Sequence, residues 1–288
     1  LPCDFLEIGL KHTYCCCPTW VNLYSFGEID ENFDLDKVWN SDAAKQFRQS
    51  ILDGSFRFCN ATLCPMIQNG TLPNRADPEL NPRYQRILEG NLSISDIPIE
   101  INLCYDQSCN LRCPSCRKNF IYIKKNEPEY KRKQILQENI LKHLNKHPNQ
   151  RIKISCTGSG DPFGSLLFME FLTQLDAKKT PNIDVLLQTN GVLFTAKNWK
   201  KLHKIHGNAS TIISLDAGNK EAYDKCRVGG DWNRLMKNLK LIKCLKAQGK
   251  LHYVRLDMVV QNNNFRTMKK FVEISMYHNF NCYLSRIV

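Results

Sequence analysis

An α/β fold is predicted for residues 91–288, because apolar, strand-like runs alternate there with amphipathic stretches of helical length. This alternation is typical of repeated βα units and a parallel sheet. The strand-like runs are residues 97–105, 151–157, 183–190, 210–216, 251–261 and 281–288. The clearest helical stretches are residues 131–147, 165–177 and 232–248. Six strands with five connecting helices fit an open, partial (β/α)6, TIM-like barrel, and we expect a last helix, missing from this sequence, to follow the sixth strand.

Residues 1–90 follow a different pattern, and we expect them to form a small, irregular domain in front of the barrel. Their segments are short and rich in turn residues. One helix is predicted, from an N-cap at Ser41 to a closing Gly54. Residues 72–85 are rich in Pro and Asn and are expected to form a linker.

The composition is that of a globular chain with unusual cysteine content. Of 288 residues, 42% are hydrophobic and 24% charged, and 14 are cysteines. No apolar run approaches the roughly 18 residues that cross a bilayer, so no membrane partner is expected. No export signal is visible, although a start without Met leads us to expect a trimmed terminus. Cysteines in a chain of this kind indicate metal binding in a reducing, cytoplasmic compartment.

The formal charge of +12 comes from 40 Lys and Arg against 28 Asp and Glu. Such a balance permits a nucleic-acid partner. The basic residues are scattered and have little aromatic interleaving. We therefore favour solvated helix faces over a nucleic-acid surface.

Three closely spaced cysteines, Cys109, Cys113 and Cys116, follow the first barrel strand with the spacing C-x3-C-x2-C. Three thiolates on one loop can hold three irons of a [4Fe–4S] cluster and leave the fourth iron free for a small molecule. A structural zinc site is the alternative, but it needs a fourth Cys or His nearby. Cys104 lies five residues upstream and could serve only if the loop folded back.

The spacing resembles the cluster loop of the radical S-adenosylmethionine (SAM) enzymes. The resemblance implies that SAM binds the free iron through its amino and carboxylate groups. Reductive cleavage of SAM would then give a 5′-deoxyadenosyl radical, which abstracts a hydrogen atom from the substrate. It also implies a reductase partner such as flavodoxin or ferredoxin.

The loops after the later strands resemble the SAM-binding segments of the same superfamily. Residues 157–165 resemble the Gly-Gly-Glu-Pro motif that holds the SAM amino group, and residues 189–191 match a strand-end turn. Residues 214–230 resemble the segment that binds the ribose and carboxylate. The residues that the resemblance assigns to SAM are Gly158, Ser159, Gly160, Asp161, Asn190, Ser214, Asp216, Arg227, Val259 and Gln261.

The match to the superfamily has two departures, and single residues also have ordinary explanations. Ser159 and Asp161 replace the central Gly and Glu of the amino-group motif. Ser115 stands before the third cysteine, where an aromatic residue is common, so adenine stacking is expected from Phe120 or Tyr122. Taken alone, residues 157–165 also fit a plain βα turn, Asp216 an N-cap and Arg227 a surface ion pair.

The N-terminal cysteines resemble a SPASM-type auxiliary domain, here placed before the barrel. The resemblance implies a second [4Fe–4S] cluster. Its expected ligands are Cys3, either Cys16 or Cys17, Cys59 and Cys64. We favour Cys16 among the adjacent Cys15, Cys16 and Cys17, but the sequence does not choose. A zinc-stabilised module and buried free thiols are the alternatives.

A radical SAM enzyme that modifies a peptide or protein is the function that the resemblance implies. The alternatives are radical oxidation or epimerisation of a sugar or another small metabolite, and a zinc-stabilised nucleic-acid-binding module. Modification of tRNA or rRNA is permitted by the charge but supported by no motif. No catalytic residue is assigned. His143 and His147 have helical i, i+4 spacing without the Glu of a zinc-protease motif, and we expect them on solvated helix surface.

Overall fold

The computed structural model describes residues 4–72, 74, 82–156 and 160–286. Within them, nine strands form one sheet in the order β3-β2-β1-β4-β5-β6-β7-β8-β9. The strands are β1 (Phe5–Ile8), β2 (His12–Tyr14), β3 (Gly27–Glu28), β4 (Glu100–Leu103), β5 (Ile152–Cys156), β6 (Ile183–Thr189), β7 (Ala209–Ser214), β8 (Val254–Val260) and β9 (Asn281–Arg286). All six strands predicted for the barrel, β4 to β9, are confirmed, and each pairs in parallel with the next.

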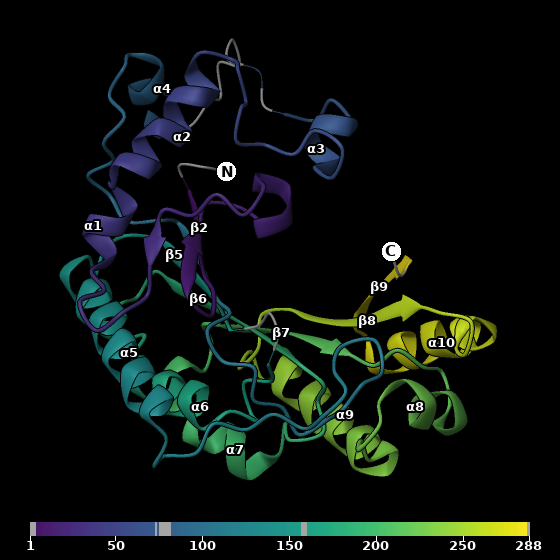
Figure 1. Cartoon of the computed structure of the whole chain (residues 1–288). Coiled ribbons are helices and arrows are strands. Elements are labelled where there is room, and N and C mark those ends of the chain that lie inside the picture. Colours follow the sequence, from purple (N-terminus) through teal and green to yellow (C-terminus); the bar gives the residue numbers. More distant parts are fainter. Residues whose placement is uncertain (1–3, 73, 75–81, 157–159, 287–288) are drawn as a thin grey trace.

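Helices follow the outer side of the curved sheet (Figure 1). The helices between the parallel strands are α5 (Pro128–Lys146), α6 (Leu166–Gln174), α7 (Ala196–Lys201), α8 (Lys220–Cys226), α9 (Trp232–Ala247) and α10 (Met268–His278), with short 3-10 turns η2 (His203–Ile205) and η3 (Phe265–Thr267). The connection from β7 to β8 contains two helices, α8 and α9. The sheet is open, since β3 and β9 lie at its two ends and do not pair with each other.

Residues of the N-terminal segment extend this sheet, which the sequence pattern did not predict. Strand β1 pairs in parallel with β4, from Phe5 opposite Glu100 to Ile8 opposite Leu103. Strands β2 and β3 add antiparallel pairs. One continuous core includes Leu6 and residues from all the central barrel strands. The division of the chain at residue 90 stays a prediction, but the two parts share a sheet and a core.

The rest of the N-terminal segment is helical or irregular. It contains η1 (Pro18–Val21), α1 (Leu35–Trp39), α2 (Asp42–Leu52), α3 (Pro65–Gln68) and α4 (Pro82–Leu88). The predicted N-cap is confirmed, because the Ser41 hydroxyl accepts from the Ala44 N–H at 3.2 Å. The linker predicted over residues 72–85 extends too far, because helix α4 begins at Pro82. The first position of a helix tolerates proline, since its N–H would have no partner within the helix. Most of the remaining linker lies outside the described residues.

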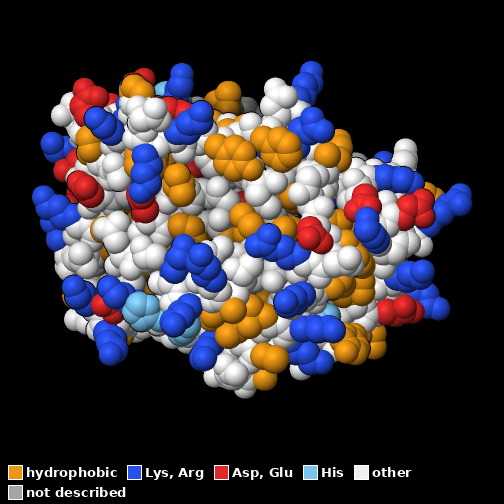
Figure 2. All heavy atoms as spheres, turned by 90° about the horizontal axis from the view of Figure 1, so that it is seen from below, with side chains coloured by type: hydrophobic (Ala, Val, Ile, Leu, Met, Phe, Trp, Pro, Cys, Tyr) orange, Lys and Arg blue, Asp and Glu red, His pale blue; other side chains and the backbone are white. Residues whose placement is uncertain are grey.

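Strand β7 is buried on both faces, β4, β6 and β8 alternate between buried and partly buried residues, and β9 is largely exposed. In β7 five consecutive residues, Ala209 to Ile213, are buried, as expected for a parallel strand covered by helices. In β9 the side chains of Tyr283 and Leu284 are exposed. No helix within the described ranges combines the length and apolar character needed to cross a membrane. On the face in Figure 2, Lys and Arg side chains are scattered among apolar and neutral ones, in agreement with their spread along the sequence.

Candidate active site at the strand ends

The three cysteines of the 109–116 loop lie directly beyond the carboxyl end of β4. Cys109 and Cys113 are buried, and Cys116 is exposed. The loop is fixed at both ends: the Cys109 N–H donates to the Ile121 carbonyl at 3.0 Å, and the Cys116 N–H donates to the Cys113 carbonyl at 2.9 Å. The thiols therefore have defined positions before any ligand binds.

Nitrogen donors surround the three sulfur atoms. Arg227 Nη1 lies 3.6 Å from the Cys113 Sγ, and Arg117 Nη2 lies 3.3 Å from the Cys116 Sγ. Asn190 Nδ2 lies 3.8 Å from the Cys109 Sγ. Donors and positive charge favour the thiolate, which is the form that binds metal. Burial nevertheless raises the pKa of Cys109 to about 11, so its proton must leave when a metal binds.

The three sulfur atoms of this loop are not gathered around the position of a single zinc ion. Around one tetrahedral zinc, with Zn–S bonds of about 2.3 Å, the sulfur atoms would lie about 3.8 Å apart. Among the described residues, one group brings three metal-type ligand atoms within 4.8 Å of one another, and it contains no cysteine.

A cavity of about 180 Å³ opens beside the thiols. Besides the cysteines, its walls include the predicted residues Gly160, Asp161, Asn190, Ser214 and Arg227. Together with the cysteines, these residues come from the ends of four strands, and they meet because parallel strands end at one edge of the sheet. Gly158 and Ser159, also predicted, lie outside the described residues. A small molecule in this cavity would contact the thiol loop.

Asp161 holds two of the loops together. Its Oδ2 accepts from the Thr189 hydroxyl and from the Asn190 N–H, both at 2.8 Å. Its Oδ1 accepts from the N–H groups of Phe163 and Gly164 at 3.0 and 3.1 Å. Burial raises the pKa of Asp161, and these four hydrogen bonds oppose that rise. The carboxylate replacing the family's Glu is thus occupied within the protein, and its predicted contact with SAM stays a prediction.

Gly160 makes a close approach that only glycine allows. A Cβ atom at this position would lie 2.4 Å from the Asp106 carbonyl oxygen and 3.0 Å from that of Ser108. The next N–H, of Asp161, donates to the Ser108 carbonyl at 2.9 Å. The glycine therefore lets the loop after β5 pack directly on the cysteine loop.

Asp216 and Arg227 form a buried ion pair on the other side of the cavity. Arg227 Nη2 lies 2.7 Å from Asp216 Oδ2, and the two side chains are 14% and 5% exposed. Burial acts to lower the pKa of Arg227, but Asp216 and Cys113 raise it, with a net rise. The Arg227 Nε is buried and has no hydrogen-bond partner within the described part of the chain.

The backbone at Asp216 is unusual, with a φ of 56°, in the left-handed region. Its Oδ1 accepts from the Val259 N–H at 2.8 Å, which links the ends of β7 and β8. Asn264 completes this link, because its Nδ2 donates to the carbonyls of Asp216 and Val259 at 2.9 and 2.8 Å. A non-glycine residue in this conformation is strained, and such strain is common at functional sites.

The remaining predicted residues lie at the margin of the site. Gln261 follows β8, and its Nε2 is buried without a hydrogen-bond partner among the described residues. Phe120 and Tyr122 are 47% and 52% exposed and are not among the residues that line the cavity. Their predicted stacking on adenine is not tested.

Several site residues were not predicted, among them Arg117, Gln188 and Asn264. Arg117 contacts the Cys116 sulfur, and Gln188 lines the cavity. A signal existed for Gln188, which is a polar residue near the carboxyl end of an apolar strand. For Asn264 no such signal existed, because it lies in the 3-10 region after β8.

The N-terminal thiols form a second group. Cys64 is buried and Cys16 and Cys59 are partly buried, while Cys3 lies outside the described residues. Burial raises the pKa of Cys16 to about 11 and also raises that of Cys59, and nearby Cys64 adds to both rises. The turn that carries Cys59 and Cys64 is held to η1 by the Asn60 N–H, which donates to the Trp20 carbonyl at 2.8 Å.

Comparison with known proteins bears on the barrel alone. The family model described as the radical SAM superfamily matches residues 107–256, which is more than half of the 288 residues. The matched segment begins just before Cys109 and runs through β8 as far as Leu256. No curated protein matches the chain.

Proposed function

We propose a function for this chain from one premise: the chain belongs to the radical SAM superfamily. Membership implies an enzyme with a [4Fe–4S] cluster that cleaves SAM reductively. The finer proposal is that Cys109, Cys113 and Cys116 hold this cluster and that SAM occupies the adjoining cavity. The observation that carries it is the cavity of about 180 Å³ lined by all three thiols and by residues at the ends of three further strands.

The cluster and SAM, when bound, supply the electron and the radical that removes a hydrogen atom from the substrate. The protein's own part is binding and orientation. Arg227 offers a charged donor for a carboxylate, and Asp216 fixes the direction of that donor. Gly160 and Asp161 shape the wall against the cysteine loop.

The proposal extends to a second [4Fe–4S] cluster on the N-terminal cysteines. Its ligands would be Cys3, Cys16, Cys59 and Cys64, with Cys17 as the alternative to Cys16. The electrostatic influence of Cys64 on both Cys16 and Cys59 supports this grouping, because it requires the thiols to be neighbours. A peptide or protein is the proposed substrate, as in the SPASM-type relatives that these cysteines resemble, and flavodoxin or ferredoxin is the proposed reductant.

Anaerobic reconstitution tests the proposal. We expect about eight irons per chain for two clusters, and slow release of 5′-deoxyadenosine when dithionite and SAM are added. Four irons with cleavage would remove the second cluster but keep the first. Bound zinc without cleavage would overturn the proposal.

The substrate class needs a separate assay. Formation of 5′-deoxyadenosine should rise when the correct polypeptide is added, as a panel of peptides and proteins would show. Stimulation by a nucleotide sugar alone would overturn the peptide assignment and leave the SAM chemistry intact.

A further inference from the structure

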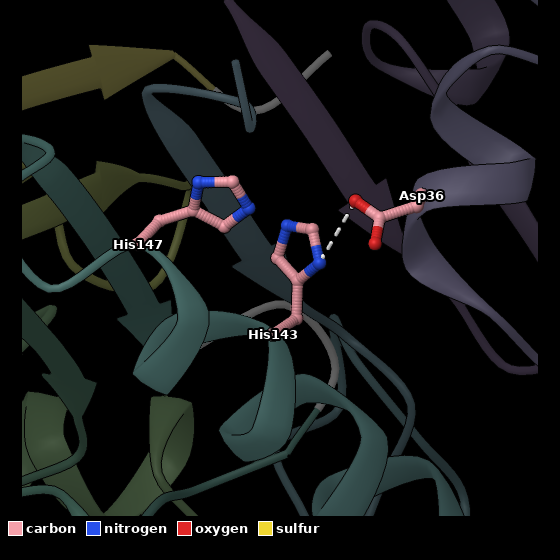
Figure 3. A group of neighbouring side chains, drawn as sticks. All are labelled: Asp36, His143 and His147. Atoms are coloured by element: carbon pink, nitrogen blue, oxygen red, sulfur yellow. Dashed lines mark ion pairs between the residues drawn. The ribbon is translucent and has the colours of Figure 1, made fainter. Parts of the chain in front are cut away.

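Three side chains of metal-binding type meet on the outer side of the barrel, away from the cysteines. Asp36 belongs to α1, His143 to the last turn of α5, and His147 is the residue that ends α5. One ligand atom from each lies within 4.8 Å of the other two (Figure 3). The expectation that both histidines lie on solvated helix surface is wrong for His143, which is 4% exposed because α1 packs over it.

His143 is held in one orientation and leaves one nitrogen unpartnered. Its Nδ1 lies 3.1 Å from Asp36 Oδ1. Its Nε2 is buried and has no hydrogen-bond partner among the described residues. If Nδ1 carries the proton that Asp36 accepts, Nε2 presents a lone pair. A histidine that donates one ring N–H to a carboxylate and offers the other nitrogen is the usual arrangement of a metal ligand.

His147 lies on the side to which that lone pair points. The two ring centroids are 5.0 Å apart, with the planes tilted by 42°. In Figure 3 a ring nitrogen of His147 faces the Nε2 side of His143, while Asp36 lies on the opposite side. His147 is partly exposed, so its ring has room to turn and an ion has a route from solvent.

We propose that His143 and His147 together bind one divalent transition-metal ion of the zinc class, with Asp36 orienting His143. Neutral imidazole suits zinc, copper and nickel ions. The second oxygen of Asp36 lies 3.6 Å from Lys146 Nζ, so the carboxylate acts from outside the coordination sphere. Its charge offsets that of the ion. Water ligands complete the coordination.

The site would join two parts of the chain that are distant in sequence. Asp36 lies in the N-terminal segment and the histidines in the first helix of the barrel, so bound metal stabilises the contact between α1 and α5. Because the ion binds only the folded chain, the melting temperature should rise with metal concentration. This site is independent of the cluster chemistry.

The test uses anaerobic, cluster-loaded protein, in which the thiols proposed as cluster ligands are already occupied, treated with EDTA and desalted. Zn²⁺ is then titrated by equilibrium dialysis with metal counting. We expect one Zn²⁺ per chain in addition to the iron. His147→Gln should lose this binding, and Asp36→Asn should weaken it roughly 10- to 100-fold, the usual effect of losing a carboxylate behind a ligand.

His252→Gln is the matched control, because His252 is an exposed histidine outside this group, and its Zn²⁺ affinity should equal that of the wild type. His147 is partly exposed, so its variant is expected to fold, and a melting curve without zinc verifies this. Zn²⁺ binding that is equal in His147→Gln and wild type, or absent from both, would overturn the proposal. A zinc-dependent rise in melting temperature for the wild type and none for His147→Gln would support it.

Discussion

The two groups of cysteines differ in what surrounds their sulfur atoms. At the 109–116 loop, Arg117, Asn190 and Arg227 direct nitrogen donors at the three thiols. Around Cys16, Cys59 and Cys64, the described part of the chain provides no comparable side-chain donor. Burial raises the pKa of Cys16 and of Cys59, and nearby Cys64 adds to both rises. The surroundings of the first group therefore favour thiolates, whereas those of the second favour neutral thiols until a proton is lost.

Removing one cysteine from each group gives the largest expected difference. Cys113→Ala should abolish SAM cleavage and lose about half of the iron, because the first cluster loses a ligand. Cys59→Ala should also lose about half of the iron but still release 5′-deoxyadenosine without substrate. Iron counts and chromatography of the reaction measure both. Exposed Cys244 provides the control, since Cys244→Ala should change neither. Cleavage by Cys113→Ala would refute the assignment of the first cluster.

Breaking the Asp216–Arg227 pair should have the next largest effect. Arg227→Ala leaves a buried carboxylate without its partner and should lower the free energy of unfolding by about 3 kcal/mol, besides weakening SAM binding. Urea denaturation measures the first effect. Lys225→Ala breaks an exposed pair with Glu221 in the same helix and should cost below about 0.5 kcal/mol. If the two variants lost equal amounts of unfolding free energy, burial would not strengthen the ion pair between Arg227 and Asp216.

Asp161→Asn should destabilise the protein by about 2 kcal/mol, because an amide nitrogen cannot accept from both donors that one carboxylate oxygen now serves. Asp176→Asn is the control. Among the described residues, the Asp176 carboxylate accepts one hydrogen bond, from the exposed Lys178 N–H at 3.0 Å, so the loss of unfolding free energy should stay within about 0.5 kcal/mol. Thermal or urea unfolding measures the free energy of unfolding of both variants. Equal losses of unfolding free energy in the two variants would mean that the loops around the cavity beside the thiols do not depend on Asp161.

The smallest expected effect concerns pH, and it compares the two thiol groups directly. Cys16 and Cys109 each have a folded pKa of about 11, above the ordinary value of 9.0. The folded state binds these two protons more tightly than the unfolded state does. Their contribution to the free energy of unfolding is therefore complete below pH 9 and is lost as the pH rises through about 11. Two pKa units correspond to at most about 3 kcal/mol per thiol, of which the range from pH 9 to 11 samples only part, and solvent screening lowers the value further for Cys16, which is partly exposed. In metal-free, reduced protein, Cys16→Ala and Cys109→Ala should each reduce the loss of stability between pH 9 and 11, as urea unfolding at both pH values would measure. An unchanged pH dependence in one variant would show that its thiol has an ordinary pKa.

Sequence reasoning predicted the barrel strands because apolar, strand-like runs alternate with amphipathic stretches of helical length. It missed β1 because four residues, Phe5–Ile8, are too few to show a period. The site residues that follow strands were found by position, whereas Asn264 acts through a turn that brings it back to Asp216. His143 was misjudged because its burial depends on α1, more than 90 residues earlier in the chain, and no local pattern reports such a contact.

The parallel pairing of β1 with β4 sets an order of events during synthesis. Phe5 leaves the ribosome long before its partner Glu100 exists, and parallel strands far apart in sequence pair slowly. Until then β1 and the short β2 lack the neighbour that would cover their open edge. Once β4 is made, β1 can pair with one edge of it, and β5 pairs with the other edge after α5 has been made. Strand β4 is the strand that leads into the cysteine loop. A nascent chain stalled before residue 100 should therefore depend on chaperones more than one stalled after residue 156.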